Sequence, residues 1–416
     1  MRRRFAPAAI AASTLLALGS TALSAHAAPS TATGSEPAAA GEYIVVLTDN
    51  AVSGRIASVH DARFGVNVGH VYNAALNGYS AKMTPAVADL VAQDPAVQWV
   101  QKDTPVKTTA QSTPTGINRS QADLSPTAAI NGTDQRVNVD VAVIDTGVDL
   151  THPDINVYSA GAKNCSVGAV NANDLNGHGT HVSGTVGAID NGSGVVGMAP
   201  GARIWPVKVL TDAGSGLNSD VICGIDYVTA HADEIEVANM SLGGAGTDDG
   251  NCGNSNDDAM HTAICSSVAA GITYAVAAGN DSEDASNSTP AAYDEVITVS
   301  ALADFNGLPG GGAASTCRSD QDDTFASFSN FGADVDIIAP GVCINSTWML
   351  GGYNTISGTS MASPHVAGGA ALYTANNPAA TPAQVKAALR SAGSSNWSNA
   401  DDPDGTKEPL LDVSTY

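Results

Sequence analysis

The chain has 416 residues, of which 43% are hydrophobic and only 14% charged, a globular composition that excludes a disordered chain. Its formal net charge of −24 at pH 7 disfavours binding to nucleic acid or to an anionic membrane surface. The formal charges of residues 1–109 sum to +1 and those of residues 110–416 sum to −25, so the excess of acidic residues lies in the later part of the chain.

Residues 1–27 have the three-part pattern of a secretory signal peptide. Arginines at 2–4 give a positive start, an apolar run covers 6–23, and Ala25-His26-Ala27 has small residues two apart. We expect cleavage after Ala27 and a secreted, extracellular protein. A membrane anchor is the alternative, but the run is short, and no later stretch reaches the ~20 apolar residues that a spanning helix needs.

All six cysteines follow this segment. An even number in an exported chain favours disulfides, and the absence of a Cys-x-x-Cys pair gives little support to a zinc or redox site. Fifteen connectivities are possible, and the sequence does not choose among them. Our prediction pairs Cys165 with Cys223, Cys252 with Cys265, and Cys317 with Cys343.

A small α+β unit is predicted over residues 42–103, after a low-complexity linker at 28–41. A strand at 43–47 and a helix at 52–64 come first. Two strands then span 70–83 around Asn77-Gly78, a common hairpin signal. A helix to about Ala92 and a strand at 97–100 complete a β-α-β-β-α-β, ferredoxin-like order.

A second unit is predicted over residues 110–416, after a processing linker at 104–109. Its apolar strands alternate with helical patterns, which implies a mostly parallel sheet between two layers of helices. The predicted strands are 137–144, 202–210, 235–241, 272–278, 295–301 and 335–339. The predicted helices are 178–188, 218–231, 257–270, 359–376 and 382–391.

Four polar motifs lie where strands end or helices begin in this unit, and sites in such sheets form beyond the carboxyl ends of strands. They contain Asp145, His178, Asn280 and Ser360. A serine needs an imidazole to take its proton, and a carboxylate must orient the imidazole. A serine N–H at a helix start and a side-chain amide can stabilise an oxyanion. Each motif alone is weak evidence for a catalytic site. Their occurrence together, in the order Asp, His, Ser, indicates nucleophilic acyl transfer.

These motifs resemble those of the subtilisin-like serine proteases. The matching segments are Asp145-Thr146-Gly147, Gly177-His178-Gly179-Thr180-His181-Val182 and Gly358-Thr359-Ser360-Met361-Ala362-Ser363-Pro364. The resemblance implies a triad of Asp145, His178 and Ser360, with Asn280 completing an oxyanion hole. It implies structural roles for His181 and His365.

The resemblance also assigns residues 42–103 to an inhibitor propeptide, which assists folding, blocks the substrate cleft and is removed by self-cleavage. We place the processing bond at Thr109/Ala110, with a cut elsewhere between 104 and 112 as the alternative.

Substrate contacts follow from the same resemblance. One edge segment that pairs with a bound peptide is Gly214, Ser215 and Gly216; the other is Ser241, Leu242 and Gly243, which also forms a wall of the specificity pocket. The opposite wall is Ala277, Ala278 and Gly279. Because these walls carry no acid, we expect a broad preference for large apolar or aromatic residues before the cut, unless the loop with Glu283 and Asp284 turns inward.

A structural calcium ion is the only cofactor implied, with no organic cofactor. The resemblance assigns its ligands to Gln111, Asp154, Ile189, Asn191, Ser193 and Val195. Mixed carboxylate, amide and carbonyl oxygens suit calcium; the alternative is an ordinary Asn-Gly turn. Acids near Cys252 (Asp248, Asp249, Asp257, Asp258) could hold a second cation or form a solvated loop.

The expected protein is a monomeric, secreted serine endopeptidase made as a self-processing zymogen. Its partners are protein and peptide substrates and its own propeptide, with no nucleic acid and no membrane after processing. One alternative is an esterase, disfavoured because Ser360 is not in a Gly-x-Ser-x-Gly elbow. The other is a catalytically silent secreted binding protein on the same fold.

Overall fold

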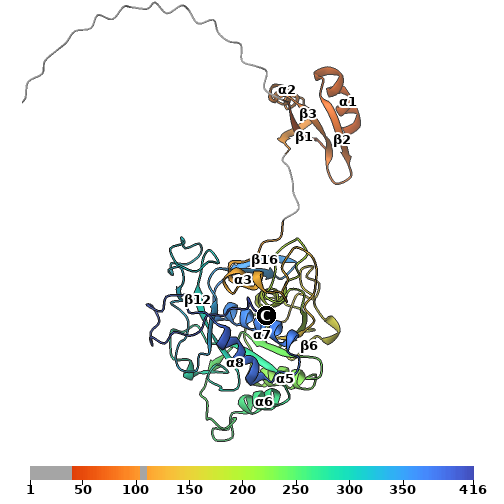
Figure 1. The fold of residues 1–416 in the computed structure, drawn as a ribbon. Helices are drawn as coiled ribbons and strands as arrows, with labels where there is room; N and C mark the ends of the chain where they lie inside the picture. Colours follow the sequence, from red (N-terminus) through yellow and green to blue (C-terminus); the bar gives the residue numbers. More distant parts are fainter. Residues whose placement is uncertain (1–39, 104–109) are drawn as a thin grey trace, which may run out of the picture. The chain divides into compact units, whose positions relative to one another are not determined.

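The computed structural model describes residues 40–103 and 110–416 (Figure 1). The chain divides into two compact units between residues 107 and 108. The predicted signal peptide, most of the linker at 28–41 and the processing linker at 104–109 lie outside the described residues. No helix in the described ranges combines the length and the apolar character that crossing a bilayer requires.

The first unit has the predicted β-α-β-β-α-β order. Its elements are β1 (Gly41–Leu47), α1 (Ser53–Phe64), β2 (Asn67–Asn73), β3 (Asn77–Met83), α2 (Pro85–Val91) and β4 (Val97–Lys102). The strands form one antiparallel sheet in the order β2-β3-β1-β4. Thr84 caps α2 by accepting a hydrogen bond from Val87 N, and Pro85 occupies the first helical position, where its missing N–H costs nothing.

The hairpin turn in this unit differs from the prediction. Asn73 pairs with Asn77, so the turn is formed by residues 74–76, and Asn77-Gly78 belongs to β3. The Asn77 amide donates to the carbonyls of Thr48 and Ala51, which fixes the loop after β1. A Cβ at Gly78 would lie 2.2 Å from Val45 O. This dipeptide therefore serves close strand packing rather than the turn.

The second unit is built on one sheet, in the order β13-β12-β10-β8-β5-β7-β6, with β14 pairing with β12. All of its pairings are parallel except that of β13. The central strands are buried on both faces, as is typical of parallel sheets. The strands are β5 (Asp140–Asp145), β6 (Lys163–Asn164), β7 (Arg203–Lys208), β8 (Val237–Met240), β10 (Thr273–Ala277), β12 (Ile297–Ala303), β13 (Thr324–Phe325) and β14 (Ile337–Pro340).

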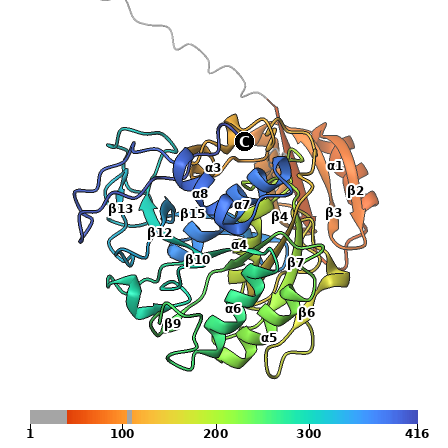
Figure 2. The same ribbon diagram turned by 60° about the horizontal axis from the view of Figure 1, so that its bottom comes forward.

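Helices cover both faces of this sheet (Figure 2). On one face α4 (His178–Gly187), α7 (Thr359–Asn376) and α8 (Pro382–Ala392) share the larger apolar core. On the other, α5 (Asn218–Thr229) and α6 (Ala259–Ala269) enclose a second core around Trp205. The predicted three-layer α/β architecture is confirmed.

Several short elements were not predicted, because each is too short to show periodicity. They are α3 (Thr115–Arg119), the short strands β6, β9 (Gly244–Ala245), β11 (Ser288–Thr289) and β13, the hairpin β15 (Ile344–Trp348) with β16 (Gly352–Ile356), and three 3-10 turns at 122–124, 159–161 and 285–287. The three predicted disulfides are all present: Cys165–Cys223, Cys252–Cys265 and Cys317–Cys343.

Candidate active site

Asp145 and His178 form the centre of the candidate site. Asp145 is the last residue of β5, and His178 is the first residue of α4. The Nδ1 atom of His178 lies 2.8 Å from Asp145 Oδ1, and the aspartate is fully buried while the imidazole is 25% exposed. Burial alone would lower the pKa of His178, but the charge and hydrogen bond of Asp145, helped by the charge of Asp174, outweigh it and raise this pKa.

Close backbone packing brings these two residues together. A Cβ at Gly179 would lie 2.1 Å from Gly147 O and 3.1 Å from Asp145 Oδ1, so only glycine fits after His178. The N–H of Gly179 donates to Thr146 Oγ1, next to Asp145 in the chain. Lys208 is buried on the adjacent strand, and its ammonium donates to Thr146 O and Asp212 Oδ1. The end of β5 is therefore fixed from two sides.

Asp174 is a positioning residue that the sequence analysis missed. Its carboxylate accepts hydrogen bonds from the backbone of Asn176, Gly177 and Thr180. It thereby holds the entry to α4 and the backbone on which His178 stands. An aspartate shortly before an Asn-Gly step is a sequence signal for a turn that the aspartate side chain stabilises. This signal could have identified Asp174 from the sequence.

Ser360 lies in the first turn of α7, where the partial positive charge of the helix is concentrated. Its hydroxyl donates to Ser241 O at 3.3 Å, so among the described residues its acceptor is this carbonyl rather than His178. Ser360 and His178 nevertheless line the same cavity. Catalytic hydrogen bonds are often absent or long without substrate and form when it binds.

The amide of Asn280, just after β10, is oriented by its neighbour. Asn280 Oδ1 accepts hydrogen bonds from Thr359 N (2.8 Å) and Thr359 Oγ1 (3.0 Å), which leaves Nδ2 as the outward donor. An ideal Cβ built on Gly358 would lie 3.7 Å from Ser360 N and 3.8 Å from Asn280 Nδ2. Both nitrogens therefore lie near Gly358, beside Ser360.

Two cavities meet at Ser360. One, of about 490 Å³, is lined by His178, Ser360 and both predicted edge segments. The segments contribute Gly214, Ser215, Gly216, Ser241, Leu242 and Gly243. The other, of about 330 Å³, has the predicted small-residue wall of Ala277, Ala278 and Gly279. The structure thus places every predicted substrate residue around Ser360.

The smaller cavity also contains acids. Asp281 and Glu283 both line it, and both are exposed. Asp284 is not among its lining residues; its carboxylate accepts from Ser286 N instead. The contribution of Glu283 was raised as a possibility from the sequence, whereas that of Asp281 was not foreseen.

The two remaining histidines of the motifs are buried in the core. His181 Nε2 lies 3.0 Å from Ile344 O, and His365 Nδ1 lies 2.8 Å from Met361 O. Burial lowers the pKa of His181 to about 3 and that of His365 to about 4. Both imidazoles are therefore neutral at physiological pH, which suits packing roles.

The predicted calcium ligands gather around the loop 189–195. Asp154, buried, accepts from Asn191 Nδ2 (3.0 Å) and Val195 N (2.9 Å). Burial raises the pKa of Asp154. Gln111 Oε1 accepts from Gly192 N (2.6 Å), and Asn191 N donates to Ile189 O (3.0 Å). Ser193 N donates to Asn191 Oδ1 (2.8 Å). This set of carboxylate, amide and carbonyl oxygens fits calcium chemistry.

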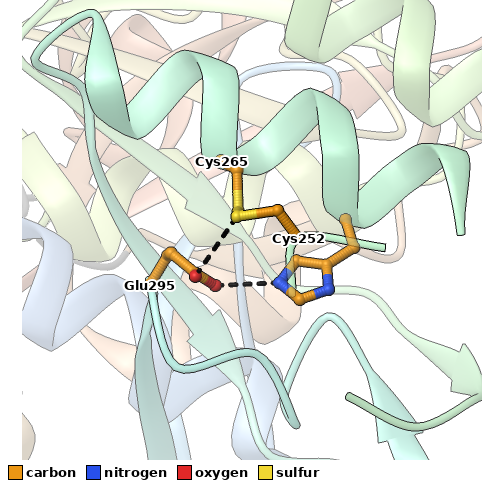
Figure 3. A group of neighbouring side chains, drawn as sticks. Cys252, Cys265 and Glu295 are labelled. Carbon is orange, nitrogen blue, oxygen red and sulfur yellow. Dashed lines mark hydrogen bonds and ion pairs between the residues drawn. A yellow bond between two sulfur atoms is a disulfide. The ribbon is translucent and has the colours of Figure 1, made fainter. Parts of the chain in front are cut away.

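The acidic region near Cys252 is organised around His261. Figure 3 shows Glu295 of this region beside Cys252 and Cys265. Glu295 Oε2 lies 2.9 Å from His261 Nε2, and Asp248 and Asp249 each lie 3.5 Å from Nδ1. Cys252 and Cys265 also point into this cluster, but they form a disulfide, so their sulfurs are not thiolate ligands. Asp257 and Asp258 take no part in it: Asp258 caps α6 and accepts from Tyr293.

The site as a whole is that of a serine hydrolase. It combines a carboxylate-bound imidazole, a serine at a helix start, paired nitrogen donors and a cavity with glycine-rich edges. Comparison with known proteins narrows this class. Residues 136–406 match the Subtilase family and residues 42–109 match Peptidase inhibitor I9. The chain belongs to the subtilase family.

Individual relatives agree with this assignment. The chain is 37% identical over 316 residues to the alkaline protease of Shouchella clausii, covering 76% of this chain and 74% of that protein. It is 38% identical over 319 residues to subtilisin E of Bacillus subtilis, covering 76% of this chain and 75% of that protein. A crystal structure of a cold adapted subtilisin-like serine proteinase matches with a TM-score of 0.54 and 33% identity, covering 72% of this chain and 97% of the other. The chain is thus a serine protease with a propeptide-type inhibitor unit.

Proposed function

We propose that the protein is a secreted, self-processing endopeptidase in which Asp145, His178 and Ser360 form the catalytic triad. The observation that carries the proposal is the 2.8 Å contact between His178 Nδ1 and buried Asp145, which leaves Nε2 free beside the cavity that Ser360 lines. This contact fixes the tautomer that accepts a proton at Nε2 and stabilises the imidazolium that follows.

The reaction proceeds through an acyl-enzyme. Ser360 Oγ leaves its contact with Ser241 O and bonds to the scissile carbonyl carbon, while its proton passes to His178 Nε2. Ser360 N and Asn280 Nδ2 stabilise the oxyanion. The carbon–nitrogen bond then breaks, and His178 gives its proton to the leaving amine. Water then attacks the acyl carbon of the resulting ester while His178 accepts a proton from that water. The bond between the acyl carbon and Ser360 Oγ breaks, His178 returns its proton to Oγ, and the carboxylic acid product leaves.

Specificity arises from the cavity beyond Ser360. Its walls of alanine and glycine leave about 330 Å³ for the side chain before the cut. A cavity with such walls favours large apolar or aromatic residues. Asp281 and Glu283 are exposed, so solvent screens them, and we assign them only a secondary attraction for a lysine at this position. The glycine-rich edges pair with the substrate backbone, which places little demand on sequence.

The N-terminal unit supports the proposal that the protein is made as a zymogen. Its match to Peptidase inhibitor I9 supports the proposal that residues 42–103 inhibit the enzyme until self-cleavage at Thr109/Ala110. Release outside the cell is supported by the leader pattern and by the name of one relative, the extracellular serine proteinase of Thermus sp., 38% identical over 330 residues. We further propose that the mature enzyme is a monomer that binds no nucleic acid and no membrane.

Calcium is proposed as a structural ion held by Gln111, Asp154, Asn191 and the loop 189–195. When bound, it would neutralise the buried charge of Asp154 and tie residue 111 to the loop. Replacing Asp154 by Asn should remove the dependence of the melting temperature on this ion. A melting temperature of the wild-type enzyme that is indifferent to a calcium chelator would argue against the site.

A serine-directed phosphonylating inhibitor tests the triad. We expect one inhibitor group on the peptide that contains Ser360, together with loss of casein hydrolysis. Ser360→Ala should take up no label. Ser363→Ala is the matched control: this residue lies one turn along α7 and bonds Asn239 instead. Labelling of Ser360→Ala, or a preference for short-chain esters over casein, would contradict the proposed peptidase.

A further inference from the structure

The loop 246–258 and the start of α6 bring three potential metal ligands together. One donor atom each from Asp248, Asp249 and His261 lies within 4.8 Å of the others. The Nδ1 atom of His261 lies 3.5 Å from Asp248 Oδ1 and 3.5 Å from Asp249 Oδ1. Two donors that are each bound at about 2.1 Å to one tetrahedral zinc ion lie about 3.4 Å apart. The three groups are therefore close enough to share one ion.

The imidazole of His261 is oriented as a ligand. It is fully buried, and its Nδ1 atom has no hydrogen-bond partner among the described residues. Its other nitrogen, Nε2, lies 2.9 Å from Glu295 Oε2, and the ring is stacked on Tyr293 with ring centres 4.0 Å apart. The contact with Glu295 favours a proton on Nε2 and a free lone pair on Nδ1, on the side of Asp248 and Asp249. A metal-binding histidine usually has a carboxylate or carbonyl on its second nitrogen in this way.

Negative charge is in excess around this imidazole. In the described ranges, Asp248, Asp249 and Glu295 form ion pairs only with His261. Desolvation acts to raise the pKa of Asp249, but hydrogen bonds from three backbone N–H groups of its own loop lower it to about 2, so this carboxylate is charged at neutral pH. A protonated His261 would offset one negative charge, whereas a divalent ion beside a neutral imidazole offsets two.

Both aspartates are held in place and keep free lone pairs. Asp248 accepts hydrogen bonds from Gly250 N (2.7 Å) and Asp294 N (3.4 Å). Asp249 accepts three, all from backbone N–H groups of the same loop. A carboxylate offers about four acceptor positions, so each of the two can still bind an ion. Carboxylates that bind metals commonly accept such additional hydrogen bonds.

We propose that Asp248, Asp249 and His261 bind a divalent transition-metal ion of the zinc type. An imidazole nitrogen among the ligands favours such an ion over calcium, which takes oxygen ligands. Three protein ligands leave a further position of a zinc ion for water. The bound ion joins the loop 246–258 to the first turn of α6, a role that is independent of the proposed calcium loop at 189–195.

Zinc binding by the secreted protein tests this site. The protein is treated with a serine-directed inhibitor to prevent self-digestion and is dialysed against zinc in excess calcium, which fills sites made of oxygen ligands. Asp248→Asn removes a charged ligand and Glu295→Gln removes the carboxylate on Nε2, so we expect each to weaken zinc binding by about 10–100-fold. Asp257→Asn changes an exposed acid of the same loop outside the cluster and should bind zinc as the wild type does. Equal zinc binding in all four proteins, or none in the wild type, would overturn the proposal.

A crystallographic measurement needs no variant. Crystals of the wild-type protein are equilibrated with zinc, and anomalous differences are recorded at the zinc absorption edge. We expect a peak about 2.1 Å from His261 Nδ1 and from one oxygen each of Asp248 and Asp249. Peaks at other residues only would identify adventitious zinc and contradict the site. A map without a peak would leave His261 as an ion-pair partner of these acids, which also contradicts it.

Discussion

Asp145 and Glu408 are both buried carboxylates, but their surroundings are opposite. Asp145 Oδ1 accepts from Thr146 N at 2.6 Å and contacts His178 Nδ1 at 2.8 Å. Glu408 has neither a donor nor a cation at its carboxylate within the described residues. The fold thus supplies two partners to Asp145 Oδ1, although Oδ2 of the same residue is buried without one among the described residues. Burial, by contrast, raises the pKa of Glu408 to about 8, so this carboxyl is neutral near pH 7. The first carboxylate orients the proposed catalytic base, whereas the second keeps its proton in a setting that offers no partner.

The largest effect should come from removing the charge at Asp145. Asp145→Asn keeps the shape but favours the wrong imidazole tautomer, so we expect kcat to fall by about 10⁴-fold, as in other triads. Steady-state hydrolysis of a peptide substrate measures this. Asp226→Asn, in an exposed residue of α5, is the control and should keep full activity. A loss of less than tenfold in Asp145→Asn would show that this carboxylate does not orient the base.

Removal of the oxyanion donor should have the second-largest effect on activity. Asn280→Ala removes the outward Nδ2 donor, and we expect kcat to fall by about 10²–10³-fold. KM should change little, because the donor acts mainly on the transition state. The same peptide assay separates the two constants. A rise in KM at constant kcat would mean that Asn280 binds substrate instead of stabilising the oxyanion.

The acid side of the pH profile should report the contact between Asp145 and His178. The base works only when His178 is neutral, and its pKa is raised above the ordinary value of 6.5. Activity should therefore be lost as the pH falls through a midpoint above 6.5, by about tenfold per pH unit below it. The profile of kcat/KM gives this midpoint. A midpoint below 6.5 would indicate that Asp145 does not stabilise the imidazolium.

The exposed acids at the specificity cavity should have the smallest effect. Asp281→Asn combined with Glu283→Gln should lower cleavage after lysine, relative to phenylalanine, by only a few fold, because solvent screens exposed charges. Paired peptides that differ at this one position measure the ratio. Raising the salt concentration should have a similar effect on the wild type. An unchanged ratio would show that these carboxylates do not reach the substrate.

The sequence predicted the architecture well where the pattern was local. Short apolar runs that alternate with helical patterns predicted a strand that ends at Asp145 and a helix that begins at His178, because strands buried on both faces leave continuous apolar runs in the sequence. The Asn77-Gly78 step was misread, since its cause is the approach of Val45 O from another strand. The sequence could not show this long-range contact.

The sequence predicted the main residues of the candidate site but not the residues that position them. Motifs identified Asp145, His178, Asn280 and Ser360. The fold places the last three at two cavities that share Ser360, and it buries Asp145 in contact with His178. The positioning role of Asp174, the place of Asp281 in the specificity cavity and the isolation of Glu408 were not predicted, whereas Glu283 was raised as a possibility. Each of these features depends on how loops that are distant in the sequence pack against one another, and the sequence of a loop does not reveal its direction.

The intact mass of the secreted protein tests the central claim most directly. The wild type is compared with Ser360→Ala after the same expression and purification. If Ser360 is the nucleophile of a self-processing enzyme, the wild type begins near Ala110, while Ser360→Ala retains the unit at 42–103. If both proteins begin at the same residue near 110, another protease removes that unit, and self-processing by Ser360 is contradicted.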